Sequence, residues 1–127
     1  MPTILIADDQ PDMRRLIKQT LEDLEDEGVE IITAENGKEA LDLIKEKRPE
    51  LVLLDIMMPL MDGFEVCEEV KNRLFMKEVY IVMVTAKGQE IDRNKGKECG
   101  CDDYITKPFS TAEIEDKARE ILFPAKK

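Results

Sequence analysis

The segment "LVLLDIMMPLMDG", residues 51–63, contains an apolar run that ends in a carboxylate, Asp55. A strand this uniformly apolar is typical of a parallel sheet that is covered by helices on both faces. An unpaired carboxylate in the middle of such a sheet would cost free energy. We therefore expect Asp55 to lie at the rim of the sheet, with its base buried and its tip open.

The rest of the chain alternates short apolar runs with amphipathic stretches. Besides 51–55, strands are predicted at 3–7, 29–34, 79–86 and 103–106. Helices are predicted at about 10–26, at 37–47, at 64–74, within 88–100, and from a cap at Ser110 to 122. This order predicts an α/β fold, a doubly wound five-stranded parallel sheet with right-handed crossovers.

Apolar residues at helical spacing indicate which helix faces turn toward the sheet. On the first helix these residues are Met13, Leu16, Ile17, Leu21 and Leu24. On the third they are Phe64, Cys67, Val70 and Leu74. The segment 88–100 carries Ile91 as its only large apolar residue, so we expect it to be among the least stable elements.

Composition limits the classes of function. A length of 127 residues suits one domain, predicted at 1–124, with 125–127 as a short tail or the start of a linker. A formal net charge of −10 argues against nucleic-acid binding, and the absence of histidine excludes serine-histidine and cysteine-histidine catalysis. With no membrane-length apolar run and no secretory signal, we expect a cytoplasmic protein with reduced cysteines.

Polar residues follow most of the predicted strands, at the point where each strand ends. Asp8 and Asp9 follow the first strand, Asp55 ends the third, Thr85 lies near the end of the fourth, and Lys107 follows the fifth. Because the carboxyl ends of parallel strands point the same way, these side chains should converge on one edge of the sheet. The edge is the predicted ligand site.

Three carboxylates at one edge repel one another. At about 4 Å and an effective dielectric constant near 20, each pair costs roughly 4 kcal/mol. Lys107 offsets only part of this charge, and the remainder favours a hard divalent cation, for which Mg²⁺ is the natural choice. Mg²⁺ leaves coordination positions for phosphate oxygens, so the edge is suited to phosphoryl chemistry with Asp55 as nucleophile.

The motifs "ADD" (7–9), "LLDIMMPLMDG" (53–63), "VTA" (84–86) and "YITKPF" (104–109) together resemble one family. It is the receiver domain of two-component response regulators, the CheY-like family, and the resemblance covers about residues 3–122. The resemblance implies the strand order 2-1-3-4-5. It also implies a switch that catalyses its own phosphorylation and dephosphorylation, in place of an enzyme acting on a separate substrate.

The resemblance also implies a role for each matching residue. Asp55 would take a phosphoryl group from a phosphohistidine on a partner histidine kinase. Asp9, Asp55 and the backbone carbonyl of Met57 would bind Mg²⁺, and Asp8 would reach the ion through water. Lys107 would contact the phosphoryl oxygens.

The remaining family positions concern the switch. The peptide bond from Lys107 to Pro108 would be cis, and Thr85 and Tyr104 would form the switch pair. Their motion would repack the face made by the helix within 88–100, the strand 103–106 and the last helix. That face would contact a downstream protein or output domain, and a homodimer through it is a further option. Met57 and Lys87 stand where the family tunes hydrolysis of the acyl phosphate.

Plainer interpretations compete at each position. Asp8 and Asp9 could cap the first helix, Thr85 could be a loop residue, Lys107 a surface charge, and Tyr104 a half-buried packing residue. Rival functions on the same layout are a flavin-binding flavodoxin-like protein, an aspartate-nucleophile phosphatase and a degenerate receiver. The acidic "DDQPDMRR" (8–15) lacks a phosphate-cradling loop and the spacing of a phosphatase, and the full set of acids and lysine argues against degeneracy.

Overall fold

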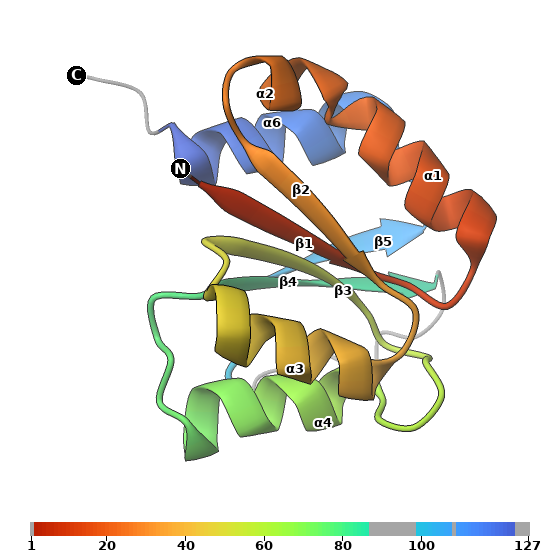
Figure 1. Ribbon diagram of the computed structural model, residues 1–127. Helices are drawn as coiled ribbons and strands as arrows, with labels where there is room; N and C mark the ends of the chain where they lie inside the picture. Colours follow the sequence, from red (N-terminus) through yellow and green to blue (C-terminus); the bar gives the residue numbers. More distant parts are fainter. Residues whose placement is uncertain (1, 87–98, 108, 124–127) are drawn as a thin grey trace.

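The computed structural model describes residues 2–86, 99–107 and 109–123, and of Thr85 and Ala86 only the backbone. The described residues form a five-stranded sheet in the order β2-β1-β3-β4-β5, with every neighbouring pair parallel (Figure 1). The predicted fold and strand order are confirmed. The strands are β1 Thr3–Ala7, β2 Glu30–Ala34, β3 Leu51–Asp55, β4 Tyr80–Ala86 and β5 Asp103–Lys107.

Helices cover both faces of the sheet, as the uniformly apolar strands predicted. In Figure 1, α1, α2 and α6 lie on one face, and α3 and α4 lie on the other. They are α1 Pro11–Thr20, α2 Glu22–Asp26, α3 Gly37–Lys47, α4 Gly63–Glu68, the π-helix η1 Glu69–Arg73, and α6 Thr111–Leu122. Most of the helix predicted within 88–100 lies outside the described residues. Among those that are described, no helix is long and apolar enough to cross a membrane.

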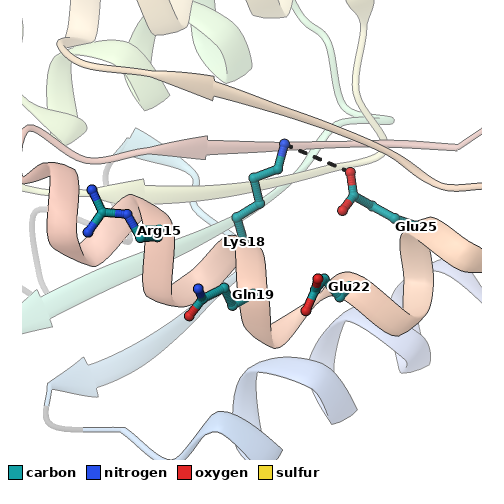
Figure 2. Close-up of a pocket in the computed structure, with 5 residues that line it drawn as sticks. All are labelled: Arg15, Lys18, Gln19, Glu22 and Glu25. Carbon is teal, nitrogen blue, oxygen red and sulfur yellow. Dashed lines mark ion pairs between the residues drawn. The ribbon is translucent and has the colours of Figure 1, made fainter.

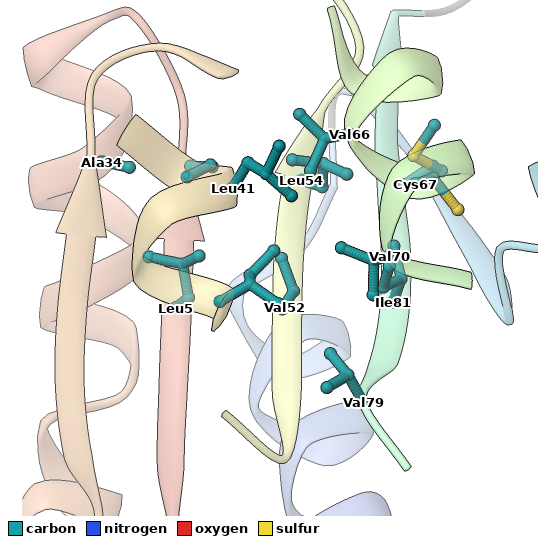
Figure 3. Close-up of a cluster of buried hydrophobic side chains, with 14 of the residues drawn as sticks. Leu5, Ala34, Leu41, Val52, Leu54, Val66, Cys67, Val70, Val79 and Ile81 are labelled. Atoms are coloured by element: carbon teal, nitrogen blue, oxygen red, sulfur yellow. The ribbon is translucent and has the colours of Figure 1, made fainter. Parts of the chain in front are cut away.

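Among the described residues, the core consists of two apolar clusters, one on each side of the sheet. Leu5 and Ala7 of β1 belong to the cluster beneath α3 and α4, whereas Ile4 and Ile6 belong to the cluster beneath α1 and α6. This alternation follows from the two-residue period of a strand and explains why β1 is apolar throughout. Figure 3 shows part of the first cluster, in which Cys67 is fully buried, as predicted.

The predicted first helix is interrupted. Leu21 separates α1 from α2, with φ −99° and ψ 11°, and its N–H bonds to the carbonyls of both Ile17 and Lys18. The break leaves Leu21 and Leu24 fully buried. The prediction for Leu16 was wrong, because the buried stripe is centred on Ile17 and leaves Leu16 41% exposed at its edge.

The predicted third helix changes its hydrogen-bond pattern half-way. In η1 the N–H of Leu74 bonds to the carbonyl of Glu69, five residues back, so the turn takes up one extra residue. The extra residue rotates the chain beyond it. Leu74, predicted to be buried, is 40% exposed, and Met76 enters the core instead.

Side-chain caps fix where three of the helices begin. Asn36, Asp62 and Ser110 each accept a hydrogen bond from the backbone N–H three residues on, which belongs to a glutamate in every case. The predicted cap at Ser110 is confirmed. At α4 the pairing is reciprocal, since Glu65 accepts from the Asp62 N–H at 2.9 Å and completes a capping box.

Candidate functional site

Three carboxylates meet where the strands end. Asp8, Asp9 and Asp55 each offer an oxygen, and these three oxygens lie within 4.8 Å of one another. Asp8 and Asp55 are buried and Asp9 is exposed, so the cluster opens to solvent on one side. The convergence predicted from the strand ends is therefore present in the structure.

The chain holds Asp8 through its backbone and through both of its carboxylate oxygens. Its N–H bonds to the carbonyl of Ala34, the last residue of β2, at 3.2 Å. Its Oδ1 accepts from the N–H of Gln10 at 2.9 Å, and its Oδ2 lies 3.5 Å from Nζ of Lys107. Asp8 is thus fixed at the junction between β1 and α1, although it is Gln10 that occupies the cap position of the helix.

Asp55 sits at the rim of the sheet, paired in register with Val84 of β4. It is 7% exposed, and burial is the main reason why the pKa of its carboxyl rises from 3.8 to about 6. The negative charge of Asp8 raises this pKa further, whereas Lys107 and the backbone N–H of Met57 oppose the rise. At neutral pH the carboxylate is ionised, in an environment that makes its charge costly.

Lys107 is the counter-ion to the two buried carboxylates. It ends β5, where it pairs in register with Ala86. Its Nζ lies 3.5 Å from Oδ2 of Asp8 and 3.7 Å from Oδ1 of Asp55. The interpretation of Lys107 as an ordinary surface charge is wrong, because its side chain is only 22% exposed and points into the acidic cluster.

The loop that follows Asp55 is held in place by two glycines that permit close backbone contacts. The N–H of Gly63 bonds to the carbonyl of Ile56 at 2.8 Å, and a Cβ at Gly63 would lie 2.5 Å from the carbonyl oxygen of Asp55. At the start of α3, a Cβ on Gly37 would lie 1.9 Å from the carbonyl oxygen of Met61. Neither position has room for a side chain, so the close approach of the loop backbone to Asp55 and to the start of α3 depends on glycine at both.

The geometry agrees with comparisons to known proteins. The family model for the response regulator receiver domain matches residues 4–119. The chain belongs to this family. Receiver domains are the phosphoacceptor switches of two-component signalling, and this general role applies to the chain. The family match decides against the flavodoxin-like and phosphatase alternatives.

Individual relatives support the same assignment. The chain is 44% identical over 124 residues to the protein named "Probable transcriptional regulator ycf27" of Porphyra purpurea, and 43% identical over 119 residues to that of Galdieria sulphuraria. The matches cover 98% and 94% of this chain but only 49% and 44% of those proteins, so the chain spans about half the length of the curated relatives it matches.

Solved structures resemble the receiver domain over nearly all of its length. The chemotaxis response regulator CheY4 of Vibrio cholerae has a TM-score of 0.83 at 30% identity, covering 96% of this chain and 99% of that one. A CheY-like receiver domain protein of Methanospirillum hungatei has a TM-score of 0.83 at 30% identity, with 94% and 92% covered.

The other predicted site residues of this receiver domain are placed only in part. The backbone of Thr85 pairs in register with Thr106, but its side chain lies outside the described part, as do Pro108 and Lys87. Tyr104 is half-buried on β5 and packs against the cluster beneath α3 and α4. Met57 directs its backbone N–H toward Asp55, while its side chain is 65% exposed.

A surface pocket of the receiver domain lies away from the acidic cluster. Residues of α1 and α2 line it, and Lys18 and Glu25 form an ion pair of 3.9 Å across it (Figure 2). The lining contains none of the three clustered carboxylates. Because the charged groups in it are already paired or open to water, we assign it no role in phosphoryl chemistry.

Sequence reasoning missed two contacts of buried or half-buried basic residues. Arg14 donates through Nη1 to the carbonyl of Asp8 at 2.7 Å. Lys71, 7% exposed, forms an ion pair of 2.8 Å with Asp102 and donates to the carbonyl of Val79. A basic residue at these positions looks like any other charge on a helix, so the sequence carried no signal for either contact.

Proposed function

We propose that this receiver domain accepts a phosphoryl group on Asp55 in a reaction that depends on Mg²⁺. The observation that carries the proposal is the meeting of Asp8, Asp9 and Asp55 within 4.8 Å of one another, with Lys107 beside two of them. One ammonium group leaves most of this negative charge without compensation. A divalent cation would neutralise the remainder.

The donor set suits Mg²⁺ rather than a softer metal. All three groups offer carboxylate oxygens, and no cysteine or histidine belongs to the cluster among the described residues. Hard oxygen ligands favour Mg²⁺ or Ca²⁺. Asp9 and Asp55, with the backbone carbonyl of Met57, are the proposed ligands, and Asp8 would act through water. When bound, Mg²⁺ would supply positive charge to the oxygens of the transferring group.

The chain's own residues carry the remaining steps. An ionised oxygen of Asp55 attacks phosphorus, a P–O bond to the acyl oxygen forms, and the bond to the leaving group breaks with its electron pair. When the donor is a phosphohistidine, the imidazole nitrogen keeps that pair. Lys107, whose Nζ lies 3.7 Å from Oδ1 of Asp55, would stabilise charge on the phosphoryl oxygens. Because the Asp55 carboxyl has a pKa of about 6, it is ionised and ready to attack at neutral pH.

We further propose that the phosphoryl group is read through Thr85 and Tyr104, which repack the face formed by residues 88–100, β5 and α6. A histidine kinase is the proposed donor. The relatives named as transcriptional regulators favour an output in transcription, through a further domain or a separate protein. We assign the receiver to residues 1–124, place it in the cytoplasm, and propose that the same face can also mediate a homodimer.

Intact mass measurement tests this proposal. The protein is incubated with a small acyl phosphate in Mg²⁺ or in excess chelator, beside Asp55→Asn and Asp42→Asn, which removes an exposed carboxylate paired with Lys38. We expect one added phosphate on the wild type and on Asp42→Asn in Mg²⁺ only, and none on Asp55→Asn. Equal uptake by Asp55→Asn, or uptake unaffected by chelator, would contradict the proposal.

A further inference from the structure

The peptide that joins Asp8 to Asp9 is held by a side chain from the neighbouring helix. Asp8 follows the last residue of β1, so its carbonyl lies beyond the paired part of the strand. This carbonyl accepts a hydrogen bond of 2.7 Å from Nη1 of Arg14, on the first turns of α1. A bond donated by a guanidinium is charge-assisted and stronger than one between neutral groups.

The contact matters because of what the peptide carries on either side. Asp8 is buried and has its own partners, Gln10 and Lys107, but Asp9 is exposed and carries the same charge as its neighbours. Repulsion from Asp8 and Asp55 favours orientations in which the Asp9 carboxylate turns away to water. Fixing the carbonyl of Asp8 restricts the backbone rotation that would allow this.

We propose that Arg14 is a positioning residue for the divalent-ion site, acting through the Asp8 carbonyl to hold the Asp9 carboxylate among the ligand oxygens. The inference rests on the proposed Mg²⁺ site and adds a residue that does not touch the ion. Removing a partner that orients a metal ligand typically weakens metal binding by about tenfold or more. That is the size of effect we expect here.

The sign of the effect separates positioning from simple electrostatics. If Arg14 acted only as a nearby positive charge, its removal would relieve repulsion of a cation and Mg²⁺ would bind more tightly. If Arg14 positions Asp9, its removal weakens binding. Arg15 is the matched control, because it lies next to Arg14 on α1, carries the same charge, and bonds only to exposed Asp12 among the described residues.

Calorimetric Mg²⁺ titration of the wild type, Arg14→Met, Arg14→Lys and Arg15→Met tests the inference without a turnover assay. We expect Kd to rise about tenfold in Arg14→Met and less in Arg14→Lys, which keeps a donor on a shorter reach. Arg15→Met should stay within twofold of the wild type. Phosphate uptake at saturating Mg²⁺ should recover in Arg14→Met, since the loss is in binding of the ion.

An unchanged or lower Kd in Arg14→Met, or an equal rise in Arg15→Met, overturns the inference. Urea unfolding in chelator accompanies each titration, and should Arg14→Met not fold, the comparison of Arg14→Lys with the wild type decides in the same way. A wild type that binds no Mg²⁺ refutes the proposed site itself and this inference with it. A wild type that binds Mg²⁺ while Arg14→Met matches it refutes the inference alone.

Discussion

Asp55 is a buried residue whose proposed role requires a negative charge. Burial and the charge of Asp8 raise the pKa of its carboxyl to about 6, whereas the proposed phosphoryl transfer requires the ionised form. The folded protein therefore holds a negative charge that costs more free energy than the same charge does in the unfolded chain. This residue should therefore lower the stability of the fold at neutral pH.

The pH dependence of stability tests this conclusion for Asp55. Its carboxyl has a pKa of about 6 in the folded protein against 3.8 in the reference state, so between these values the folded state binds more protons than the unfolded state. The free energy of unfolding contributed by Asp55 thus falls as pH rises through this range. Between pH 4.5 and 7 we expect a loss of about 2 kcal/mol from this group.

Urea unfolding of the wild type and Asp55→Asn in chelator isolates this term, because all other groups titrate in both proteins. As the pH rises from 4.5 to 7, the free energy of unfolding of Asp55→Asn should increase by about 2 kcal/mol relative to that of the wild type. A stability difference that does not change with pH would mean that Asp55 titrates near its ordinary value.

The sequence identified the residues that follow strands but not the contacts that orient them. Asp8, Asp9, Asp55 and Lys107 were predicted because the topology of a parallel sheet alone brings its strand ends together. The contact of Arg14 with the Asp8 carbonyl was not predicted. A hydrogen bond from a side chain to a backbone carbonyl depends on the rotamer of the side chain and on the conformation of the turn that presents the carbonyl. Neither of these has a signature in residue order.

The loop between β3 and α4 is the element that lies against Asp55 and shapes the site. Its backbone lies against Asp55 at Gly63 and against the start of α3 at Gly37. Leu60, at its tip, has a φ of 72° and is 77% exposed, so the conformation is set by the anchored ends and not by burial of the tip. Precise placement of Asp55 should therefore depend on both glycines.

Replacing Gly37 with alanine tests this dependence. The new Cβ would lie 1.9 Å from the carbonyl oxygen of Met61, so the loop must move, at a cost of about 1–3 kcal/mol or more. Gly28→Ala is the control, since Gly28 has a φ of +100° but nothing within 4 Å of a Cβ, and the strained backbone should cost about 1–2 kcal/mol.

Both variants are compared by urea unfolding and by the rate of phosphate uptake per folded molecule. Gly37→Ala should lose stability and slow uptake, whereas Gly28→Ala should lose stability alone. Normal uptake by Gly37→Ala would mean that the loop does not control the position of Asp55.

Among the elements, strands were predicted better than helices. A short, continuous apolar run is typical of a strand that is buried on both faces of a covered sheet, so its position is easy to predict. The predicted bounds of each strand differ from the observed bounds by one residue at most. The break at Leu21 and the π turn at 69–73 were missed, because the apolar spacing continues through both and neither position carries a glycine or a proline. The cap at Asp62 did have a signal, since Asp62 and Glu65 show the spacing of a capping box.

In the whole molecule, the repulsion among the three clustered carboxylates lowers the stability of the fold. The chain has a formal net charge of −10, and three of its carboxylates are gathered at one end of the sheet. The two apolar clusters supply the stability that tolerates this crowding. Without a cation, removal of one of these charges should make the protein more stable.

Asp9→Asn tests this expectation because Asp9 is the exposed member of the cluster. In chelator its melting temperature should exceed that of the wild type, since repulsion of Asp8 and Asp55 is relieved. Saturating Mg²⁺ should reverse the order, because a ligand at a hundred times its Kd stabilises the wild type by about 2.7 kcal/mol and the variant by less.

Asp12→Asn serves as the control, since it removes the same charge from an exposed position in the first turn of α1. It should be unchanged or slightly less stable in both conditions, because an acidic residue there is favourable to the helix. If Asp9→Asn melts below the wild type in chelator, the crowding argument is wrong.

The central claim is that Asp55, and neither Asp8 nor Asp9, forms the acyl phosphate. The direct measurement is reductive trapping: the protein phosphorylated in Mg²⁺ is treated with borohydride, which converts an aspartyl phosphate to homoserine, and its peptides are mapped by mass spectrometry. We expect homoserine at position 55 and unmodified aspartate at positions 8 and 9. Homoserine at position 8 or 9, or an unmodified Asp55 in protein that has gained a phosphate, would contradict it.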